Sequence, residues 1–233
     1  MQDYQRAFLK LALDNEILRF GSFTLKSGRV SPYFFDLGRI SSGAALAALA
    51  DAYADALTAA QLEFDLVFGP AYKGIPLAAA VAVALARRGR DVGFAYNRKE
   101  AKDHGEGGTM VGADVCRQRV VIVDDVLTAG TALRQSLALL RAAGATPVAA
   151  LIALDRQERG AHSQRSAVDE LAQESGIAVH ALVGVDHIVE YLGTGGALAA
   201  DAGTAAAICD YQKRYGAHDA TSAEAVLPGA LAS

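Results

Sequence analysis

The chain has 233 residues, 52% of them hydrophobic and 21% charged, which suits one globular domain with a buried core and excludes an intrinsically disordered protein. Its 22 Lys and Arg residues against 26 Asp and Glu residues give a formal net charge of −4, so the chain as a whole does not attract nucleic acid or an anionic membrane. A site for a polyanionic ligand must therefore be a local cluster of basic residues.

Cysteine usage and the N-terminal sequence predict the compartment. Cys116 and Cys209 lie far apart and outside any C-x-x-C motif, which argues against a disulfide framework and against structural zinc. Residues 1–16 mix charged and apolar positions, unlike a secretory signal, and the longest apolar run, residues 75–86, is too short to span a bilayer. We therefore expect a cytoplasmic protein that binds neither a membrane nor nucleic acid.

The N-terminal region predicts two helices on either side of a small sheet. Residues 4–19 place their apolar side chains on one face at helical spacing. Residues 22–40 hold β-branched and aromatic residues around a Ser-Gly turn and a Ser-Pro step, which indicates two short strands joined by a turn. Residues 43–60 return to the helical period and predict the second helix.

From residue 64 onward, short apolar runs alternate with helical stretches. The predicted strands cover residues 64–69, 91–96, 119–125, 147–155 and 177–183, and the predicted helices cover residues 75–88 and 131–143, with a short helix after the last strand. This alternation is typical of an α/β domain with a mostly parallel, doubly wound sheet, in which ligands bind at the carboxyl ends of the strands. We expect residues 1–216 to form the domain and residues 217–233, which lack periodicity, to be a mobile tail.

The most informative segment is VVIVDDVLTAGTA, residues 120–132. Asp124 and Asp125 are adjacent acids at the end of a predicted strand, and they repel each other unless ligand hydroxyls or a metal ion occupy the site. The residues from Thr128 to Thr131 then open a helix, where free N–H groups, the positive end of the helix dipole and threonine hydroxyls can hold a phosphate, with Gly130 keeping the backbone accessible. Together these features describe a site for a phosphorylated sugar. The alternative is a solvated acidic strand end followed by a threonine helix cap.

This segment resembles the phosphoribosyl pyrophosphate (PRPP) signature of the type I phosphoribosyltransferases. Residues 25–36, 68–78, 96–108 and 153–160 further resemble the orotate phosphoribosyltransferases, and the similarity covers nearly the whole chain. The resemblance implies an α/β domain of the type I kind, with a mostly parallel doubly wound sheet and a small hood formed mainly by residues 1–40. It also implies that orotate and PRPP give orotidine 5'-monophosphate and pyrophosphate, with Mg²⁺, in the de novo synthesis of UMP. Because catalytic loops cross between subunits in this family, the resemblance implies a homodimer with shared active sites.

Residues 96–108 gather four basic side chains before a run of glycines: Arg98, Lys99, Lys102 and His104. Positive charge on a glycine-hinged loop suits a lid that closes on a pyrophosphate leaving group. A solvated charged loop is the alternative, because acidic neighbours dilute the charge. Beside the phosphoribosyl motif, we favour the lid.

Three further segments supply candidates for base and pyrophosphate binding. Lys73 follows a strand between two glycines, where an ammonium can reach a phosphate. Phe34 and Phe35 are adjacent on a strand, so one faces the core while the other, or the local backbone, can border a flat pyrimidine. The planar guanidinium of Arg156 matches the carboxylate of orotate through two parallel hydrogen bonds, and the alternative is an ion pair with Asp155 or Glu158.

The resemblance then assigns roles residue by residue. It implies that the catalytic candidates are Lys26, Arg98, Lys102, His104, Asp124 and Asp125. It implies that PRPP is bound by Lys26, Tyr72, Lys73, Arg98, Lys99, Lys102, His104, Asp124, Asp125, Val126, Leu127, Thr128, Ala129, Gly130, Thr131 and Ala132. It implies that orotate is bound by Lys26, Phe34, Phe35, Thr128 and Arg156, and that Asp124 and Asp125 hold Mg²⁺ indirectly, through water and PRPP.

Two rival functions follow from the same motif. A purine-salvage phosphoribosyltransferase should lack the set Lys26, Phe34, Phe35 and Arg156, which is present here. A regulator that senses PRPP without catalysis should have a damaged lid or an added basic DNA-binding domain, and the sequence has neither. We therefore favour the enzyme that acts on orotate.

Overall fold

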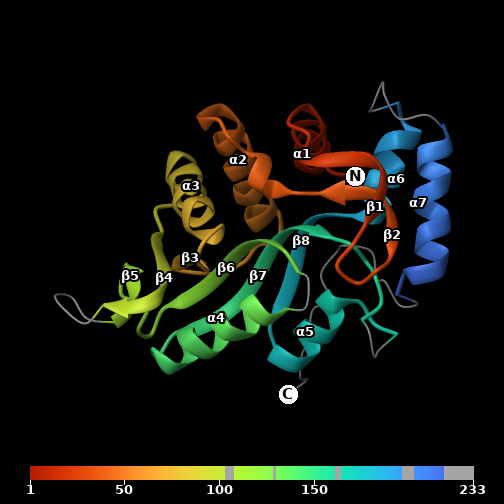
Figure 1. Ribbon diagram of the computed structural model, residues 1–233. Helices are drawn as coiled ribbons and strands as arrows, with labels where there is room; N and C mark the ends of the chain where they lie inside the picture. Colours follow the sequence, from red (N-terminus) through yellow and green to blue (C-terminus); the bar gives the residue numbers. More distant parts are fainter. Residues whose placement is uncertain (103–107, 128–129, 161–163, 196–201, 218–233) are drawn as a thin grey trace, which may run out of the picture.

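The computed structural model describes residues 1–102, 108–127, 130–160, 164–195 and 202–217 (Figure 1). Its N-terminal part holds α1 (Asp3–Asp14), the antiparallel strands β1 (Leu18–Thr24) and β2 (Val30–Phe35), a 3-10 turn (Leu37–Arg39) and α2 (Gly43–Ala59). The predicted pair of strands and the second helix are confirmed. The predicted first helix ends too late: Asn15 closes α1 by donating its side-chain amide to the Leu11 carbonyl, and the chain then turns so that Leu18 can pair with Phe35.

A six-stranded sheet forms the centre of the molecule. Its strands are β3 (Leu66–Gly69), β4 (Gly93–Lys102), β5 (Gly108–Gly112), β6 (Arg119–Val126), β7 (Thr146–Asp155) and β8 (Ala178–Gly184). They lie in the order β5-β4-β3-β6-β7-β8, and all neighbours are parallel except the antiparallel pair of β4 and β5. The chain runs outward from β3 to β4 in one direction and from β6 to β7 and β8 in the other. The carboxyl ends of β3 and β6 therefore form the switch point where a doubly wound sheet binds its ligand.

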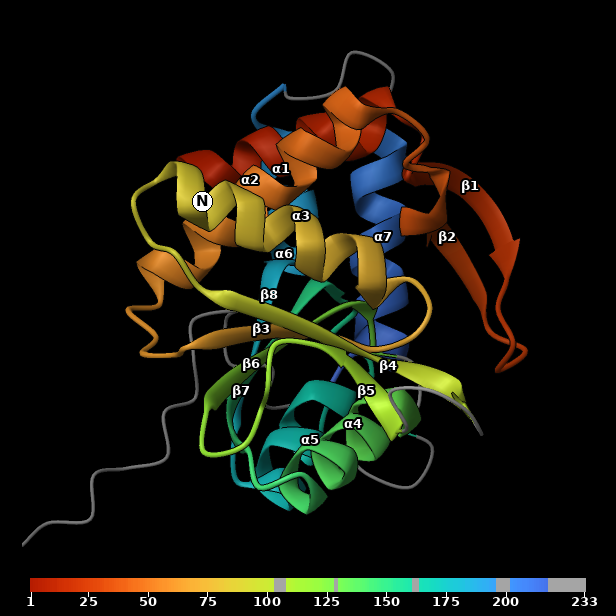
Figure 2. The ribbon, with the colours of Figure 1, turned by 90° about the vertical axis from the view of Figure 1, so that its left-hand side faces the viewer.

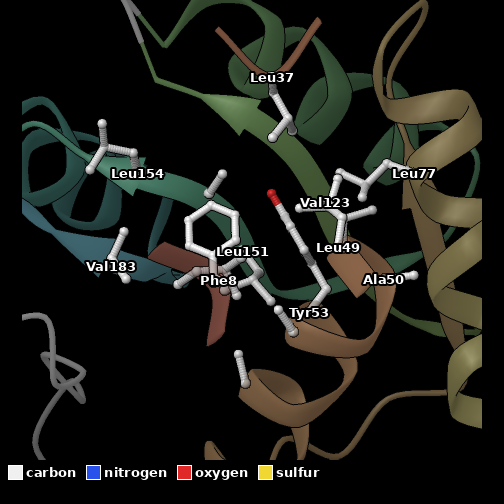
Figure 3. Close-up of a cluster of buried hydrophobic side chains, with 14 of the residues drawn as sticks. Phe8, Leu37, Leu49, Ala50, Tyr53, Leu77, Val123, Leu151, Leu154 and Val183 are labelled. Carbon is white, nitrogen blue, oxygen red and sulfur yellow. The ribbon is translucent and has the colours of Figure 1, made fainter. Parts of the chain in front are cut away.

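Helices cover both faces of this sheet, as Figure 2 shows. One face carries α1, α2 and α3 (Gly74–Arg87), together with α6 (Val185–Gly193) and α7 (Ala202–Tyr215), and the other face carries α4 (Thr131–Ala142) and α5 (Ala167–Ser175). The side chains of the strands alternate between the two cores: Val121 and Val123 face α2, whereas Val120 and Ile122 face α4. The larger core, shown in Figure 3, places Tyr53 of α2 against the end of β6. The prediction of a mostly parallel doubly wound α/β domain is confirmed.

The 3-10 turn, strand β5 and helices α5 and α7 were not predicted from the sequence. Residues 96–108 were interpreted as a loop, yet β4 continues to Lys102 and β5 begins at Gly108, with Tyr96 paired to Val111. These edge-strand segments escape a search for apolar runs because few of their side chains enter the core. Helices α5 and α7 were also missed, since only one apolar stripe of each is buried, centred on Leu171 and on Ile208 with Tyr211. Among the helices of the described ranges, none is long and apolar enough to cross a bilayer.

Candidate active site

Two loops meet at the switch point of the sheet. Lys73, in the loop after β3, places its Nζ 2.7 Å from Oδ2 of Asp125, near the end of β6. A tight turn holds the lysine: a Cβ on Gly69 would lie 1.9 Å from the Gly74 carbonyl oxygen, so no larger residue fits there. The structure thus brings together the basic loop and the acidic pair, which lie in separate segments of the sequence.

The acidic pair is held by its own backbone. Oδ1 of Asp124 accepts a hydrogen bond from the Asp125 N–H at 2.9 Å, and Oδ1 of Asp125 accepts one from the Val126 N–H at 2.7 Å. Burial, and then the neighbouring Asp125 charge, raise the pKa of Asp124 to about 6, although the Asp125 N–H and the Lys73 charge act in the opposite direction. Asp125 is therefore a carboxylate paired with a lysine, whereas Asp124 is a carboxylate whose ionised form is disfavoured by burial.

Tyr53 contacts the backbone of this acidic pair, and the sequence does not predict this contact. Its ring is fully buried in the larger core (Figure 3). Its hydroxyl donates a 2.7 Å hydrogen bond to the backbone carbonyl of Asp124. Helical spacing alone places Tyr53 in the core and gives no sign of this polar contact. The contact links helix α2 directly to the end of β6, and it therefore restrains the backbone that positions the two acids.

The N-terminus of α4 follows the acids without a long connection. Gly130 adopts a left-handed conformation, with φ of 68°, and its carbonyl accepts the N–H of Arg134 in the first helical hydrogen bond. The N–H groups of the first turn, including those of Thr131 and Ala132, have no acceptor within the helix and point toward its N-terminal end. Thr128 and Ala129 of the predicted phosphate segment lie outside the described residues.

The hood approaches the same site from the other side. Asp36, just after β2, places Oδ1 3.7 Å from Nζ of Lys73 and accepts the N–H of Gly38 at 3.0 Å, so Lys73 lies between two carboxylates. Phe35 packs against Phe8 with ring centroids 6.3 Å apart, which assigns the core-facing role to Phe35. Phe34 lies on the opposite face of β2. Lys26 is exposed on the turn between β1 and β2.

Strand β4 adds basic side chains beside the Lys73 loop. Lys99 holds its ammonium 4.6 Å from the centroid of the Tyr72 ring, and that ring is 67% exposed. Asn97 accepts the N–H of Ala71 through Oδ1 at 3.0 Å and so ties the loop to the strand, a contact that the sequence analysis did not foresee. Arg98 follows Asn97 on the same strand. The side chain of Lys102 and all of His104 lie outside the described residues.

Arg156 follows β7, the neighbour of β6, at the same edge of the sheet. Its Nε donates to Oε1 of Glu158 at 2.7 Å, its Nη2 donates to the Ser31 hydroxyl at 3.2 Å, and its guanidinium lies 4.5 Å from the centroid of the Tyr33 ring. The ion pair with Glu158, named as an alternative to substrate binding, is therefore present. It leaves the guanidinium in reach of the hood, because Ser31 and Tyr33 belong to β2.

Asp124 and Asp125 are the adjacent carboxylates that this site offers to a metal ion. Within the part of the chain that the structure describes, no group of three or more His, Cys, Asp and Glu side chains could hold a metal ion. A closed protein cage is therefore not formed by those residues. Two neighbouring carboxylates remain the donors that a hard cation with its own water and phosphate ligands would use.

Comparisons with known proteins identify the family to which the chain is similar. Residues 38–187 match the family described as a phosphoribosyl transferase domain. The chain is 58% identical over 192 residues to an orotate phosphoribosyltransferase of Xanthomonas axonopodis pv. citri, covering 82% of this chain and 88% of that protein. It is 54% identical over 217 residues to one from Xanthomonas campestris pv. campestris strain B100, covering 93% and 98%. The crystal structure of an orotate phosphoribosyltransferase from Francisella tularensis has a TM-score of 0.81 at 40% identity, covering 90% of this chain and 98% of that one.

Proposed function

The chain belongs to the phosphoribosyltransferase family and, within it, to the orotate phosphoribosyltransferases, and from this premise we propose how its residues carry the reaction. The enzyme transfers the phosphoribosyl group of PRPP to orotate, giving orotidine 5'-monophosphate and pyrophosphate in pyrimidine biosynthesis. The ring nitrogen of orotate displaces pyrophosphate at the anomeric carbon of the ribose. Positive charge builds on the sugar and negative charge on the leaving group, so the site must stabilise both.

The Lys73–Asp125 contact is the observation that carries this assignment. The ammonium and the carboxylate neutralise each other across the switch point at 2.7 Å. PRPP offers a separate partner to each: its pyrophosphate oxygens accept from Lys73, while its ribose hydroxyls donate to Asp124 and Asp125. The ion pair therefore opens when the substrate enters, and both charges remain matched.

The 5'-phosphate of PRPP binds in this proposal at the start of α4. Val126 ends the strand that carries the acids, and Gly130 immediately precedes the free N–H groups of the first turn of α4. Gly130 permits the turn, since its φ of 68° disfavours a residue with a side chain. The ribose is thus held at both ends, with its hydroxyls on the acids and its phosphate on the helix.

Orotate binds between the hood and the end of β7. Arg156 pairs with the carboxylate of the substrate, and Phe34, the backbone at Phe35 and Lys26 of the hood border its ring together with Thr128. Ser31 and Tyr33 support this placement, because both lie on β2 and both contact Arg156. The hood and the strand end thereby define a slot for an anionic pyrimidine.

Magnesium fits the two aspartates as a partly hydrated ion. Asp125 uses Oδ1 for the Val126 N–H and Oδ2 for Lys73, and Asp124 uses Oδ1 for the Asp125 N–H, which leaves few free carboxylate oxygens. Mg²⁺ commonly keeps several waters and binds through one or two carboxylates plus substrate phosphates, which agrees with an indirect site. When bound, the ion supplies electrostatic stabilisation of the charge on the pyrophosphate oxygens.

The leaving pyrophosphate is proposed to meet the basic residues of β4 and of the connection to β5. Lys99 already lies over the ring of the exposed Tyr72, Lys73 follows Tyr72 in the chain, and Arg98 with Lys102 and His104 complete the group. From the family resemblance, we further propose a cytoplasmic homodimer in which Arg98, Lys102 and His104 serve the site of the partner subunit. No covalent nucleophile is required.

The function is tested by following the absorbance of orotate. The signal should fall only when PRPP and Mg²⁺ are both present, and adenine, guanine and uracil should not replace orotate. Consumption of a purine in preference to orotate would support purine salvage instead. Binding of PRPP without consumption of any base would support the sensing regulator.

A further inference from the structure

Glu158 holds two arginines at once, and it lies two residues after Arg156. Its Oε1 accepts from Nε of Arg156 at 2.7 Å and lies 2.6 Å from Nη2 of the same side chain, while its Oε2 accepts from Nη1 of Arg29 at 3.0 Å. The Glu158 side chain is only 13% exposed. Each carboxylate oxygen is thus committed to a different guanidinium, in a setting where charged hydrogen bonds are strong.

These contacts fix the direction in which Arg156 faces. The Glu158 carboxylate occupies the Nε side of the guanidinium, and the Tyr33 ring supports its flat face at 4.5 Å. A substrate carboxylate must therefore approach the end of the guanidinium that carries Nη1. On that side the substrate competes with the Ser31 hydroxyl, which accepts from Nη2 at 3.2 Å, a longer contact than those with Glu158. A planar guanidinium held on one side presents its remaining donors in a single orientation.

The charges of this cluster also select for an anion. Two guanidinium groups face one carboxylate, so the trio of Arg29, Arg156 and Glu158 carries a net positive charge in a largely buried place. A substrate carboxylate brings negative charge to the free side of Arg156, whereas an uncharged pyrimidine does not. The cluster thereby favours a base that bears a carboxylate.

The C-terminal helix keeps Glu158 in place. The side-chain amide of Gln212 in α7 donates to the Arg156 carbonyl at 3.0 Å, and the Arg159 N–H donates to the Tyr215 carbonyl at 2.9 Å. The Arg29 guanidinium lies 5.0 Å from the centroid of the Tyr215 ring. The loop after β7 is therefore fastened to α7 on both sides of Glu158.

We propose that Glu158 is a positioning residue for orotate, which orients Arg156 without touching the substrate. The inference rests on the proposed role of Arg156 in binding the orotate carboxylate. It assigns the selection of a carboxylated pyrimidine over an uncharged one to the orientation set by Glu158 and to the positive charges of Arg29 and Arg156.

Glu158→Ala, Glu158→Gln, Arg156→Ala and the double variant Arg156→Ala/Glu158→Ala test this proposal by their KM values for orotate and PRPP. Glu158→Ala should raise the KM for orotate about tenfold and leave that for PRPP within about twofold, because the loss of the orientation of Arg156 outweighs the positive charge that the change uncovers. Glu158→Gln should lie between wild type and Glu158→Ala, since its amide oxygen still accepts from Arg156 while its NH₂ faces Arg29. In the Arg156→Ala background, removal of Glu158 should have no further effect.

The controls separate the failure of this inference from the failure of the proposed function. Asp14→Asn breaks an exposed ion pair with Lys10 on α1, away from the proposed substrate sites, and should leave both KM values unchanged. If Arg156→Ala raises the KM for orotate but Glu158→Ala does not, or if the two effects add in the double variant, the inference is wrong. If Arg156→Ala affects both substrates equally, the role of Arg156 fails and the inference fails with it. Thermal unfolding checks the fold, and Glu158→Gln carries the test if Glu158→Ala does not fold.

Discussion

The ammonium of Lys73 and the carboxylate of Asp125 meet at 2.7 Å, although they follow different strands and stand 52 positions apart in the chain. The contact exists because β3 and β6 are parallel neighbours, which brings the loops after both strands to one edge of the sheet. It also explains how two adjacent aspartates are tolerated. One of them has a cation as its partner, and the other has a raised pKa.

Asp124→Asn and Asp125→Asn should chiefly lower the turnover number. Both carboxylates are proposed to accept from the ribose hydroxyls while positive charge develops on the sugar, so their loss removes stabilisation of the transition state. We expect kcat to fall by roughly tens to thousands of fold. Steady-state kinetics measures the effect, and circular dichroism verifies that each variant is folded. Near-normal turnover in both variants would mean that the pair is only a solvated strand end.

The stability of the protein should depend on pH through Asp124. Because the folded-state pKa is raised from 3.8 to about 6, this carboxyl favours folding most when protonated, below pH 3.8, and that contribution is lost as the pH rises through 6. Asp124→Asn cannot ionise, so its free energy of unfolding relative to wild type should rise between pH 4 and pH 8, by at most about 3 kcal/mol.

Urea unfolding at the two pH values measures this difference, with the exposed Asp91→Asn as the control. A gap between Asp124→Asn and wild type that is the same at pH 4 and pH 8 would contradict the raised pKa. The same protonation should reduce binding of PRPP below pH 6, because a protonated Asp124 is a poorer acceptor for a ribose hydroxyl.

Arg156→Ala should weaken orotate far more than PRPP. The change removes a charge-assisted partner of the substrate carboxylate, which should cost roughly 2 to 3 kcal/mol, or about a hundredfold in affinity. Titration of each substrate, monitored by calorimetry, gives the two affinities. Arg141→Ala, which alters an exposed arginine in the last turn of α4, should change neither. Equal losses for both substrates would assign Arg156 a general structural role.

The parts of this site that the sequence predicted are local in the chain. Asp124, Asp125 and Gly130 fall within one short segment, where a strand end and a helix start are adjacent, so the pattern of residues fixes their neighbourhood directly. Contacts between distant segments were not predictable in this way. Asn97 reaches Ala71, and Tyr53 reaches Asp124, through pairings that only the sheet order and the helix packing determine.

The same distinction explains the errors in secondary structure. Strand β5 lies at the edge of the sheet and pairs only with β4, so burial does not impose an apolar pattern on it. Helix α1 keeps its apolar spacing up to Ile17, yet it ends at Asp14 because Leu18 is taken into the hood. Periodicity thus identifies the faces that enter the core, while tertiary pairing sets where an element stops.

Complementation between two inactive variants tests the lid and the dimer together. If Lys102 serves the site of the partner subunit while Asp125 serves its own, Lys102→Ala and Asp125→Asn damage different halves of one composite site. Each homodimer should then be nearly inactive. After exchange of equal amounts, about half of the dimers are mixed, and each mixed dimer holds one site with both residues intact, so roughly a quarter of wild-type activity should return.

This recovery depends on the two-fold symmetry of the proposed dimer, which exchanges equivalent loops reciprocally and leaves both lesions in the opposing site. If Lys102 instead served its own subunit, each site of a mixed dimer would still contain one lesion, and no activity would be regained. Orotate consumption after co-refolding, with each variant refolded alone as the control, distinguishes the two arrangements. If subunits exchange but the activity is no higher than the mean of those controls, Lys102 serves the site of its own subunit. The aspartates are the fixed reference, because they lie at the end of β6 in each subunit.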